Sequence, residues 1–168
     1  IFKPHIKKMN HFQSLKTLSY VQVRRILRIW IQTIIPPAIT TALYFLIFGE
    51  LIGSRIGEMP GYEGLTYLEF MVPGLIMLAV ITNSYANVAS AFFGAKFQKA
   101  IEEILISPMA NWAILLGFIV GGIARGVLVG VVVVLVSLFF TNFGISNVFL
   151  TLFSILLTST LFSILGLI

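Results

Sequence analysis

Four long apolar stretches constrain the fold of this chain more than any other feature of its sequence. They cover residues 29–48, 70–95, 112–140 and 148–168. Each is long enough to cross the roughly 30 Å hydrocarbon layer of a bilayer as a helix, which takes about 20 residues. A mean hydropathy of +1.03 and a charged fraction of only 10% exclude an ordinary soluble domain. We therefore predict an all-α, polytopic membrane helix bundle with four spans.

Positive charge is concentrated at one end of the predicted topology. Seven of the eleven basic residues precede the first span: Lys3, Lys7, Lys8, Lys16, Arg24, Arg25 and Arg28. The segment 49–69 instead holds four acids and a single base, Arg55. Because Lys and Arg in short loops favour the cytoplasmic side, we place the N-terminus and segment 96–111 in the cytoplasm. The loops near residues 49–69 and 141–147 are then predicted to lie outside. Besides setting the topology, the basic N-terminus is expected to attract anionic lipid, and we expect no nucleic-acid partner.

Residues 10–29 alternate basic and apolar side chains with a helical period. The apolar set is Phe12, Leu15, Leu18, Ile26 and Ile29, and the basic set is Lys16, Arg24, Arg25 and Arg28. This pattern predicts an amphipathic helix in the cytoplasmic interface, with its apolar face toward lipid and its basic face toward the headgroups. We therefore divide one transmembrane domain, 1–168, into a cytoplasmic segment with an interfacial helix, 1–29, and the spans, 30–168.

Two of the spans carry unusual residues. Pro36 and Pro37 predict a kink in the first span. The second span is polar at its middle, where Asn83 and Asn87 lie one helical turn apart. Amides in lipid need partners, so these two residues either join helices or line a polar pathway, and the sequence leaves both alternatives open.

The third span contains two ladders of glycine at four-residue spacing. They are Gly117/Gly121 and Gly122/Gly126/Gly130. Small residues in membrane helices let another backbone approach closely, so both ladders predict close helix contacts. The span is also longer than the bilayer requires, which predicts that it tilts, kinks or protrudes.

Arg125 is the single ionisable residue deep in a predicted span. A cation at bilayer depth costs about 2.5–3.5 kcal/mol on insertion scales, so it turns toward protein or water. One interpretation is structural pairing with Asn83, Asn87 or a helix C-terminus. The other is a place in the path of an anionic or amphipathic substrate.

The segment 96–108 between the second and third spans is the most specific stretch. Phe97, Ile101, Ile104 and Leu105 share one face at helical spacing, away from Lys99, Glu102 and Glu103. Pro108 ends this predicted helix, and Asn111 is placed to cap the third span. A short amphipathic helix joined to two spans suits docking of a partner. We predict the contact residues to be Phe97, Lys99, Ile101, Glu102, Glu103, Leu105, Ser107 and Pro108.

These features, in this order, resemble the membrane subunit of type-2 ABC exporters, the permease group of YadH- and NodJ-like proteins. The resemblance rests on the basic N-terminal helix, the glycine-rich segment 49–69, the polar second span, and Glu-Glu-Ile-Leu-Ile-Ser-Pro at 102–108 running into Gly117. It covers essentially the whole chain. Members of the family normally have six spans, so the apolar end at Ile168 leads us to expect missing C-terminal material.

The resemblance implies a multi-pass permease of the inner membrane that works as a homodimer or as half of a heterodimer. A separate ATPase subunit would dock on the 96–108 helix and on the N-terminal helix, and would hold ATP and Mg. The exported substrate would be a lipid, a glycan or an amphipathic drug-like compound. The chain has no Gly-x-x-x-x-Gly-Lys-Ser/Thr phosphate loop. We expect no catalytic residue, cofactor or metal in the chain itself.

Other functions fit the residues less well. An intramembrane enzyme lacks candidates, since His5 and His11 precede the spans and no predicted span contains Asp, Glu or Cys. An ion-coupled carrier usually places several ionisable groups at the midplane, and only Arg125 qualifies. An oligomeric channel or scaffold without ATP coupling is the remaining alternative, because the glycine ladders suit assembly.

Overall fold

The computed structural model describes residues 11–53, 55, 66–100, 102, 106, 110–141 and 147–168, and every element in this part of the chain is helical. The elements are α1 (His11–Arg28), α2 (Trp30–Leu46), the π-helix η1 (Ile47–Gly53), α4 (Tyr67–Phe97), α6 (Asn111–Phe140) and α7 (Val148–Leu165). Four helical segments are long and apolar enough to cross a membrane. The predicted all-α membrane bundle is therefore confirmed.

The first two candidate spans are longer than predicted. η1 continues α2, so the first span is Trp30–Gly53, and residues 49–53 are helical where a loop was predicted. The second span begins early because α4 is capped. The Glu69 carboxylate accepts a hydrogen bond from the backbone N–H of Thr66 at 3.0 Å, which satisfies a free donor at the helix start. Thr-x-x-Glu at 66–69 signals this boundary in the sequence, and the prediction missed it.

The start of the third span differs from the prediction in one detail. Ala110 occupies the N-cap position of α6, and no side-chain hydrogen bond caps the helix there. The predicted capping role of Asn111 is therefore wrong, because Asn111 is already the first helical residue. The side chain of Asn147 does cap α7, accepting a hydrogen bond from the backbone N–H of Leu150 at 3.4 Å.

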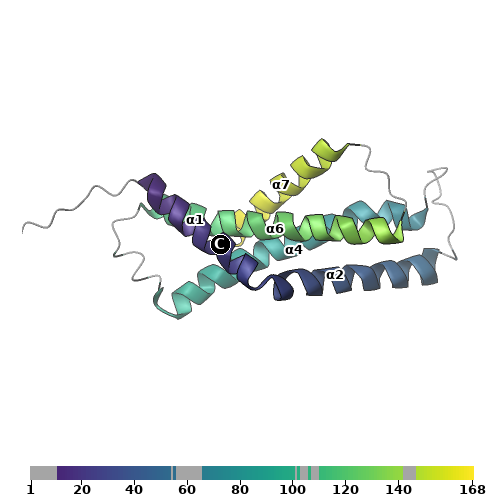
Figure 1. The fold of residues 1–168 in the computed structure, drawn as a ribbon, viewed down its shortest axis with the longest axis horizontal. Coiled ribbons are helices and arrows are strands. Elements are labelled where there is room, and N and C mark those ends of the chain that lie inside the picture. Colours follow the sequence, from purple (N-terminus) through teal and green to yellow (C-terminus); the bar gives the residue numbers. More distant parts are fainter. Residues whose placement is uncertain are drawn as a thin grey trace, which may run out of the picture.

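α6 lies at the centre of the bundle (Figure 1). It contacts α1, α2, α4 and α7, and its most extensive contacts are with α4. By contrast, α2 contacts α4 only sparsely, although both helices border α6. The bundle is thus organised around one long helix, and the sides of α2 and α4 that face each other remain partly separated.

α1 and α2 follow α6 one after the other. Leu18 packs on Gly117 and Gln22 on Gly121, so α1 runs in the same direction as the first half of α6. Further along, the Phe45 ring of α2 stacks on the Phe140 ring near the end of α6, with centroids 5.6 Å apart. Two helices joined by an elbow at residue 29 therefore accompany one continuous helix.

The packed side of α1 corrects part of the prediction for residues 10–29. Leu18 and Ile26 do form one apolar face, but that face rests on α6 rather than on lipid, because the glycines of α6 leave room for it. Phe12 and Ile29, predicted for the same face, are exposed. A residue with a polar side chain, Gln22, is buried in their place.

In the structure, other helices lie close against both glycine ladders. The first ladder receives α1, as described above. The second receives α4 and α7 together: Val88 and Ser163 at Gly122, Ser84 and Ser159 at Gly126, and Val80 and Ile155 at Gly130. A Cβ added at Gly126 would lie 2.9 Å from the Ser159 Cβ, closer than carbon atoms approach without displacement. α4, α6 and α7 thus form one tightly packed unit, which we call the glycine seam.

Two apolar clusters flank the middle of the glycine seam. One consists of Phe45, Val72, Ile76, Val80, Val129, Val133 and Ile155. The other consists of Val88, Ala91, Ile114 and Phe118. Between them, at the level of Gly126, the buried side chains of Ser84 and Ser159 take the place of large apolar ones.

Candidate functional site

The predicted docking segment begins with a break in the helix. α4 ends at Phe97, and the chain turns at Gln98 and Lys99. Lys99 has a φ of 58°, in the left-handed region, and its carbonyl accepts a hydrogen bond from the N–H of Glu102 at 3.0 Å. A left-handed residue cannot continue a right-handed helix. The prediction of one helix with Phe97 and Ile101 on the same face is therefore wrong at its start, because Phe97 belongs to α4.

Three of the eight predicted docking residues lie in the part of the chain that the structure describes. Phe97, Lys99 and Glu102 are all exposed, and Phe97 has 81% of its surface accessible. The other five lie outside the described residues: Ile101, Glu103, Leu105, Ser107 and Pro108. Their role in docking stays a prediction.

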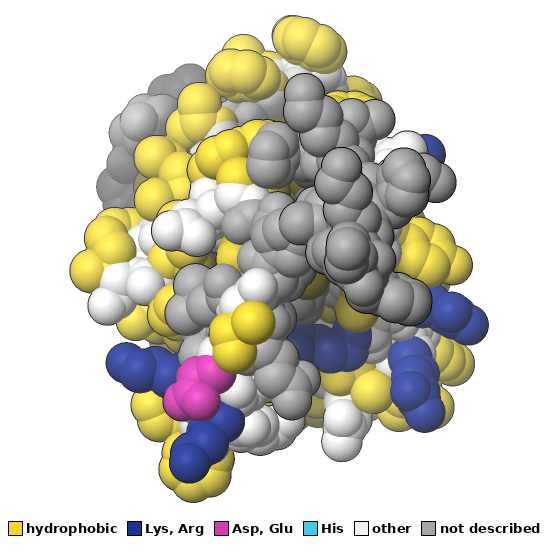
Figure 2. All heavy atoms as spheres, turned by 90° about the vertical axis from the view of Figure 1, so that its left-hand side faces the viewer, with side chains coloured by type: hydrophobic (Ala, Val, Ile, Leu, Met, Phe, Trp, Pro, Cys, Tyr) yellow, Lys and Arg dark blue, Asp and Glu magenta, His cyan; other side chains and the backbone are white. Residues whose placement is uncertain are grey.

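The start of α1, the end of α4 and the start of α6 lie at the same end of the bundle (Figure 1). Figure 2 shows this end, where Lys and Arg side chains gather on the lower half of the face. Lys96 and Lys99 are exposed beside Glu102, and Arg24 and Arg28 are exposed on α1. The structure therefore brings the basic N-terminal helix and the connector between α4 and α6 to one end, as the charge pattern predicts.

A cavity of about 370 Å³ lies between α2 and α4, with α6 at its base. Its lining comes from α2 (Gln32, Pro36, Pro37, Thr40, Thr41, Tyr44), α4 (Leu75, Leu78, Ala79, Thr82, Asn83) and α6 (Arg125). The cavity exists because α2 packs on α6 and touches α4 so little. Its volume falls in the range of small-molecule sites, about 300–1,000 Å³. We call it the α2–α4 cavity.

The α2 wall of this cavity was missed from the sequence, although a signal is present. Gln32, Pro36, Thr40 and Tyr44 recur every four residues and so share one face of the helix. α2 stays helical through Pro36 and Pro37. Because proline has no N–H, the carbonyls of residues 32 and 33 lack their usual helical donors, and polar backbone is left on or beside this face. The wall is therefore amphipathic rather than purely apolar.

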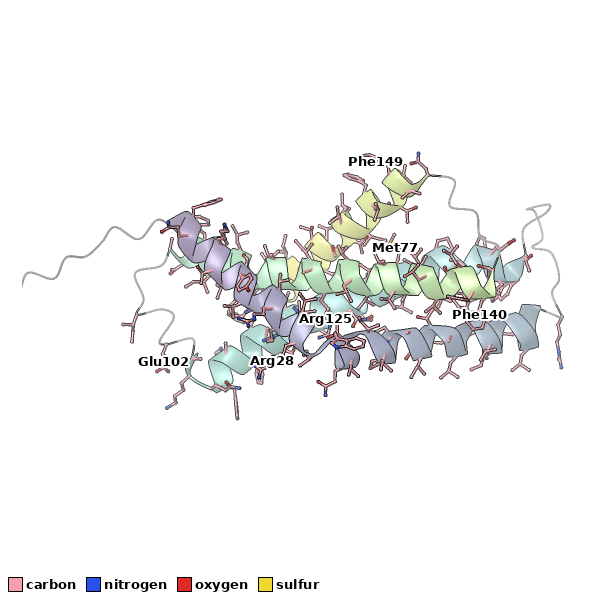
Figure 3. The ribbon with its side chains drawn as sticks, in the orientation of Figure 1. Arg28, Met77, Glu102, Arg125, Phe140 and Phe149 are labelled. Atoms are coloured by element: carbon pink, nitrogen blue, oxygen red, sulfur yellow. The ribbon has the colours of Figure 1, made fainter. Side chains whose placement is uncertain are left out.

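Arg125 has no neutralising partner among the described residues. Its Nε is buried without a hydrogen-bond partner. The described acidic side chains are those of Glu69, at the opposite end of α4, and Glu102, in the connector, and neither pairs with it. Figure 3 shows Arg125 where α1, α2 and α6 meet, well away from Glu102. The guanidinium is thus a half-buried positive charge in the wall of a cavity.

The structure separates the two asparagines that the sequence treated alike. Asn83 lines the α2–α4 cavity with Arg125, but its side-chain amide donates to the Ala79 carbonyl of its own helix at 3.0 Å. Asn87 is buried between α4 and α6, where its Nδ2 lies 3.5 Å from the position of a Cβ on Gly121. Of the two roles left open, Asn83 takes the cavity side and Asn87 the interhelical side. The predicted pairing of either residue with Arg125 is not formed.

Arg125 also lies at a different level from the one its place in α6 suggests. It is half-way along a helix of 30 residues, about 45 Å long at 1.5 Å per residue. In register, however, Gly117 meets Leu18 and Gly121 meets Gln22, which brings Arg125 level with Arg25 and Ile26 of α1. Arg25 is exposed on that turn of α1. Arg125 therefore lies beside the elbow that precedes the first span, not half-way along that span.

Comparison with known proteins decides the family. The model of the ABC-2 type transporter family matches residues 13–168. The chain belongs to the ABC-2 type transporter family. It is 50% identical over 157 residues to the Inner membrane transport permease YadH of Escherichia coli (strain K12), and equally to the proteins of that name in Escherichia coli O157:H7 and Shigella flexneri. No significant match to a solved structure was found.

The alignment covers 94% of this ABC-2 chain and 60% of each relative, so the chain spans about 60% of the length of the curated relatives it matches. The resemblance drawn from the sequence is confirmed by the family match. The chain is accordingly a transmembrane subunit of the ABC transporter class, located in the inner membrane with several spans.

Proposed function

We propose that this ABC-2 chain forms the membrane path of an ATP-driven exporter for a lipid, a glycan or an amphipathic drug-like compound. The observation that carries the proposal is the contrast around α4. One side of α4 is locked into the glycine seam, and another side borders the α2–α4 cavity. A helix held on one side and free on the other can move together with its partners and change the shape of the cavity.

The connector between α4 and α6 is where a docked ATPase subunit would act on the permease. It joins the ends of two helices that pack without space for a methyl group between them. A displacement of the connector would therefore move α4 and α6 as one body. Because α2 has little contact with α4, such a movement would widen or narrow the cavity with little loss of packing. α1, which lies on the same end of α6, offers a second surface to the same partner.

ATP binding and hydrolysis are assigned to a separate subunit, together with Mg. This assignment is supported by the family match and by the lack of a phosphate loop in the sequence. Two copies of the permease are expected in the working unit. Among the described residues of one chain, the cavity is lined by α2, α4 and α6, and a second copy would supply further walls.

The test uses the full-length protein with its candidate ATPase subunit in lipid vesicles. Glu102→Arg with Glu103→Arg reverses the charge of the connector, and we expect weaker co-purification of the ATPase and loss of ATP-dependent transport. The matched control is Glu58→Arg with Glu63→Arg, which makes the same charge change in the segment predicted to lie outside. The control should retain both properties.

Two results would contradict the proposal. Unchanged ATPase binding and transport in the connector variant would remove the connector from the coupling path. Transport that proceeds equally without ATP, or no transport with any ATPase, would favour an oligomeric channel or scaffold instead.

A further inference from the structure

We propose that the α2–α4 cavity binds an anionic amphiphile of the inner leaflet, with its phosphate or carboxylate on Arg125 and its acyl chain between α2 and α4. The binding site itself stands on the geometry of the cavity. Only the further statement that the bound amphiphile is exported rests on the function proposed above.

The first step is the unbalanced charge. Arg125 is half-buried, its Nε has no hydrogen-bond partner, and no carboxylate of the described residues reaches it. Arg25, on the turn of α1 that is level with Arg125, adds a second positive charge. A buried cation without a counter-ion is costly, and a like charge beside it raises that cost further. An oxyanion entering the cavity would relieve both effects and could accept charge-assisted hydrogen bonds from the guanidinium.

The second step is the division of the lining by chemistry. Besides Arg125, the polar residues that line the cavity include Gln32, Thr82 and Asn83. Leu75, Leu78, Ala79, Pro36 and Pro37 supply apolar surface in the same cavity. A free inorganic anion would use only the first set. A molecule with an anionic head and an apolar chain would use both.

The third step is the level of the site. Arg125 lies level with the last turn of α1, which holds Arg25 and Arg28, and Trp30 follows Arg28 by two residues at the start of the first span. A basic turn followed by an aromatic residue is typical of the boundary between headgroups and hydrocarbon. The phosphates of inner-leaflet lipids lie at this depth. Since α2 and α4 have few contacts, an acyl chain can enter between them from the side.

The test measures lipid retention by the full-length protein in nanodiscs that contain equal amounts of phosphatidylglycerol and phosphatidylcholine. After purification, bound lipids are counted by native mass spectrometry. We expect wild-type protein to retain phosphatidylglycerol in preference to phosphatidylcholine. Arg125→Gln should reduce that preference about tenfold, the effect of losing one charge-assisted contact, and Arg125→Lys should retain most of it. The matched control is Arg24→Gln, an exposed arginine on α1 that does not line the cavity and should change the preference less than about twofold.

A second variant narrows the cavity without touching the charge. Thr82 lines the cavity and is exposed in the structure, so Thr82→Leu should occupy apolar space without disturbing the core. We expect it to lower phosphatidylglycerol retention, and we expect inorganic phosphate at millimolar concentration not to displace the lipid. Displacement by phosphate alone would show that the acyl chain of the lipid is not recognised and would overturn the proposal.

The remaining outcomes are decisive in the same way. Equal loss in Arg125→Gln and Arg24→Gln would mean that surface charge, not the cavity, selects the lipid. Absence of any preference in wild-type protein would indicate that a carboxylate from the rest of the protein or from a second copy neutralises Arg125, and would also overturn the proposal. If Arg125→Gln does not fold, Arg125→Lys and Thr82→Leu still test the site.

The binding measurement needs neither ATP nor the ATPase subunit, so its failure is distinct from failure of the exporter proposal. Addition of ATP to vesicles with both subunits then separates two sources of the same chemistry. Movement of labelled phosphatidylglycerol to the outer leaflet would identify the amphiphile as cargo. Retention without movement would identify it as a resident lipid of the site.

Discussion

The glycine seam and the α2–α4 cavity lie on different faces of α4, and α6 borders both. In the seam, a Cβ added at Gly126 would collide with Ser84 and Ser159, and no space remains for one more carbon. In the cavity, about 370 Å³ is left between α2 and α4, where larger side chains such as Tyr44 and Leu78 line the space. The contrast shows that close packing of helices in a membrane depends on small residues and matched surfaces.

A pattern of small residues in α4 sharpens this point. Ala86, Ser90 and Gly94 repeat every four residues, as the glycines of α6 do. Yet Ala86 and Ser90 are exposed, and a Cβ on Gly94 would have no neighbour within 4 Å. Small-residue spacing permits a close contact without deciding whether a helix occupies it. Substitutions in the two ladders should therefore differ strongly.

The largest effect is expected from Gly126→Leu. The side chain has no room between Ser84 and Ser159, and overpacking of this kind costs about 3 kcal/mol or more of the free energy of unfolding. Unfolding in mixed micelles, followed by circular dichroism, measures the loss. Gly94→Leu is the matched control and should cause no loss of stability, because a Cβ there meets open space and leucine has a higher helix propensity than glycine. Equal losses at the two positions would remove the distinction between seam and open surface.

A smaller loss is expected from Gly166→Ala at the end of α7. The added Cβ would lie 2.8 Å from the backbone carbonyl oxygen of Tyr85, and backbone yields less readily than a side chain. We expect about 1–3 kcal/mol of destabilisation, in the same unfolding assay. No loss of stability would mean that α7 can shift relative to α4, and the seam would then be less rigid than the proposed coupling requires.

A gain is expected from Gly94→Ala. The site has open space, the glycine lies in a helix, and alanine is favoured there by about 0.5–1 kcal/mol because it loses less backbone freedom on folding. The same unfolding measurement detects this gain. A loss of similar size would reveal that a neighbour outside the described residues packs against this face of α4.

The smallest effect on stability is expected from Thr82→Leu in the α2–α4 cavity. The Thr82 hydroxyl bonds only to the carbonyls of Leu78 and Ala79 in its own helix, so its loss leaves no partner on another helix unsatisfied. We expect the free energy of unfolding to change by less than about 0.5 kcal/mol. ATP-dependent transport, measured on the same preparation, should nevertheless fall. Parallel losses of stability and transport would instead indicate that the cavity belongs to the structural core.

Local patterns in the sequence were sufficient to predict the membrane spans and the helical class of this protein. The apolar lengths predicted four spans and an all-α bundle, and the spacing of Gly122, Gly126 and Gly130 predicted close helix contacts. These features depend on residues near one another in the chain, on helical period and on the thickness of a bilayer. The order of motifs also indicated the family that the comparison confirmed.

Only the tertiary structure decided how the helices are offset from one another. The offset brings Arg125 level with the end of α1, turns Asn83 to the cavity and Asn87 to the seam, and places α1 on α6 instead of on lipid. Counting along α6 alone put Arg125 at mid-bilayer, since no local pattern reports which residue of α1 will meet which glycine of α6. That register arises from the fit of side chains such as Leu18 and Gln22 into spaces on a distant helix, and such a fit exists only once the helices have come together.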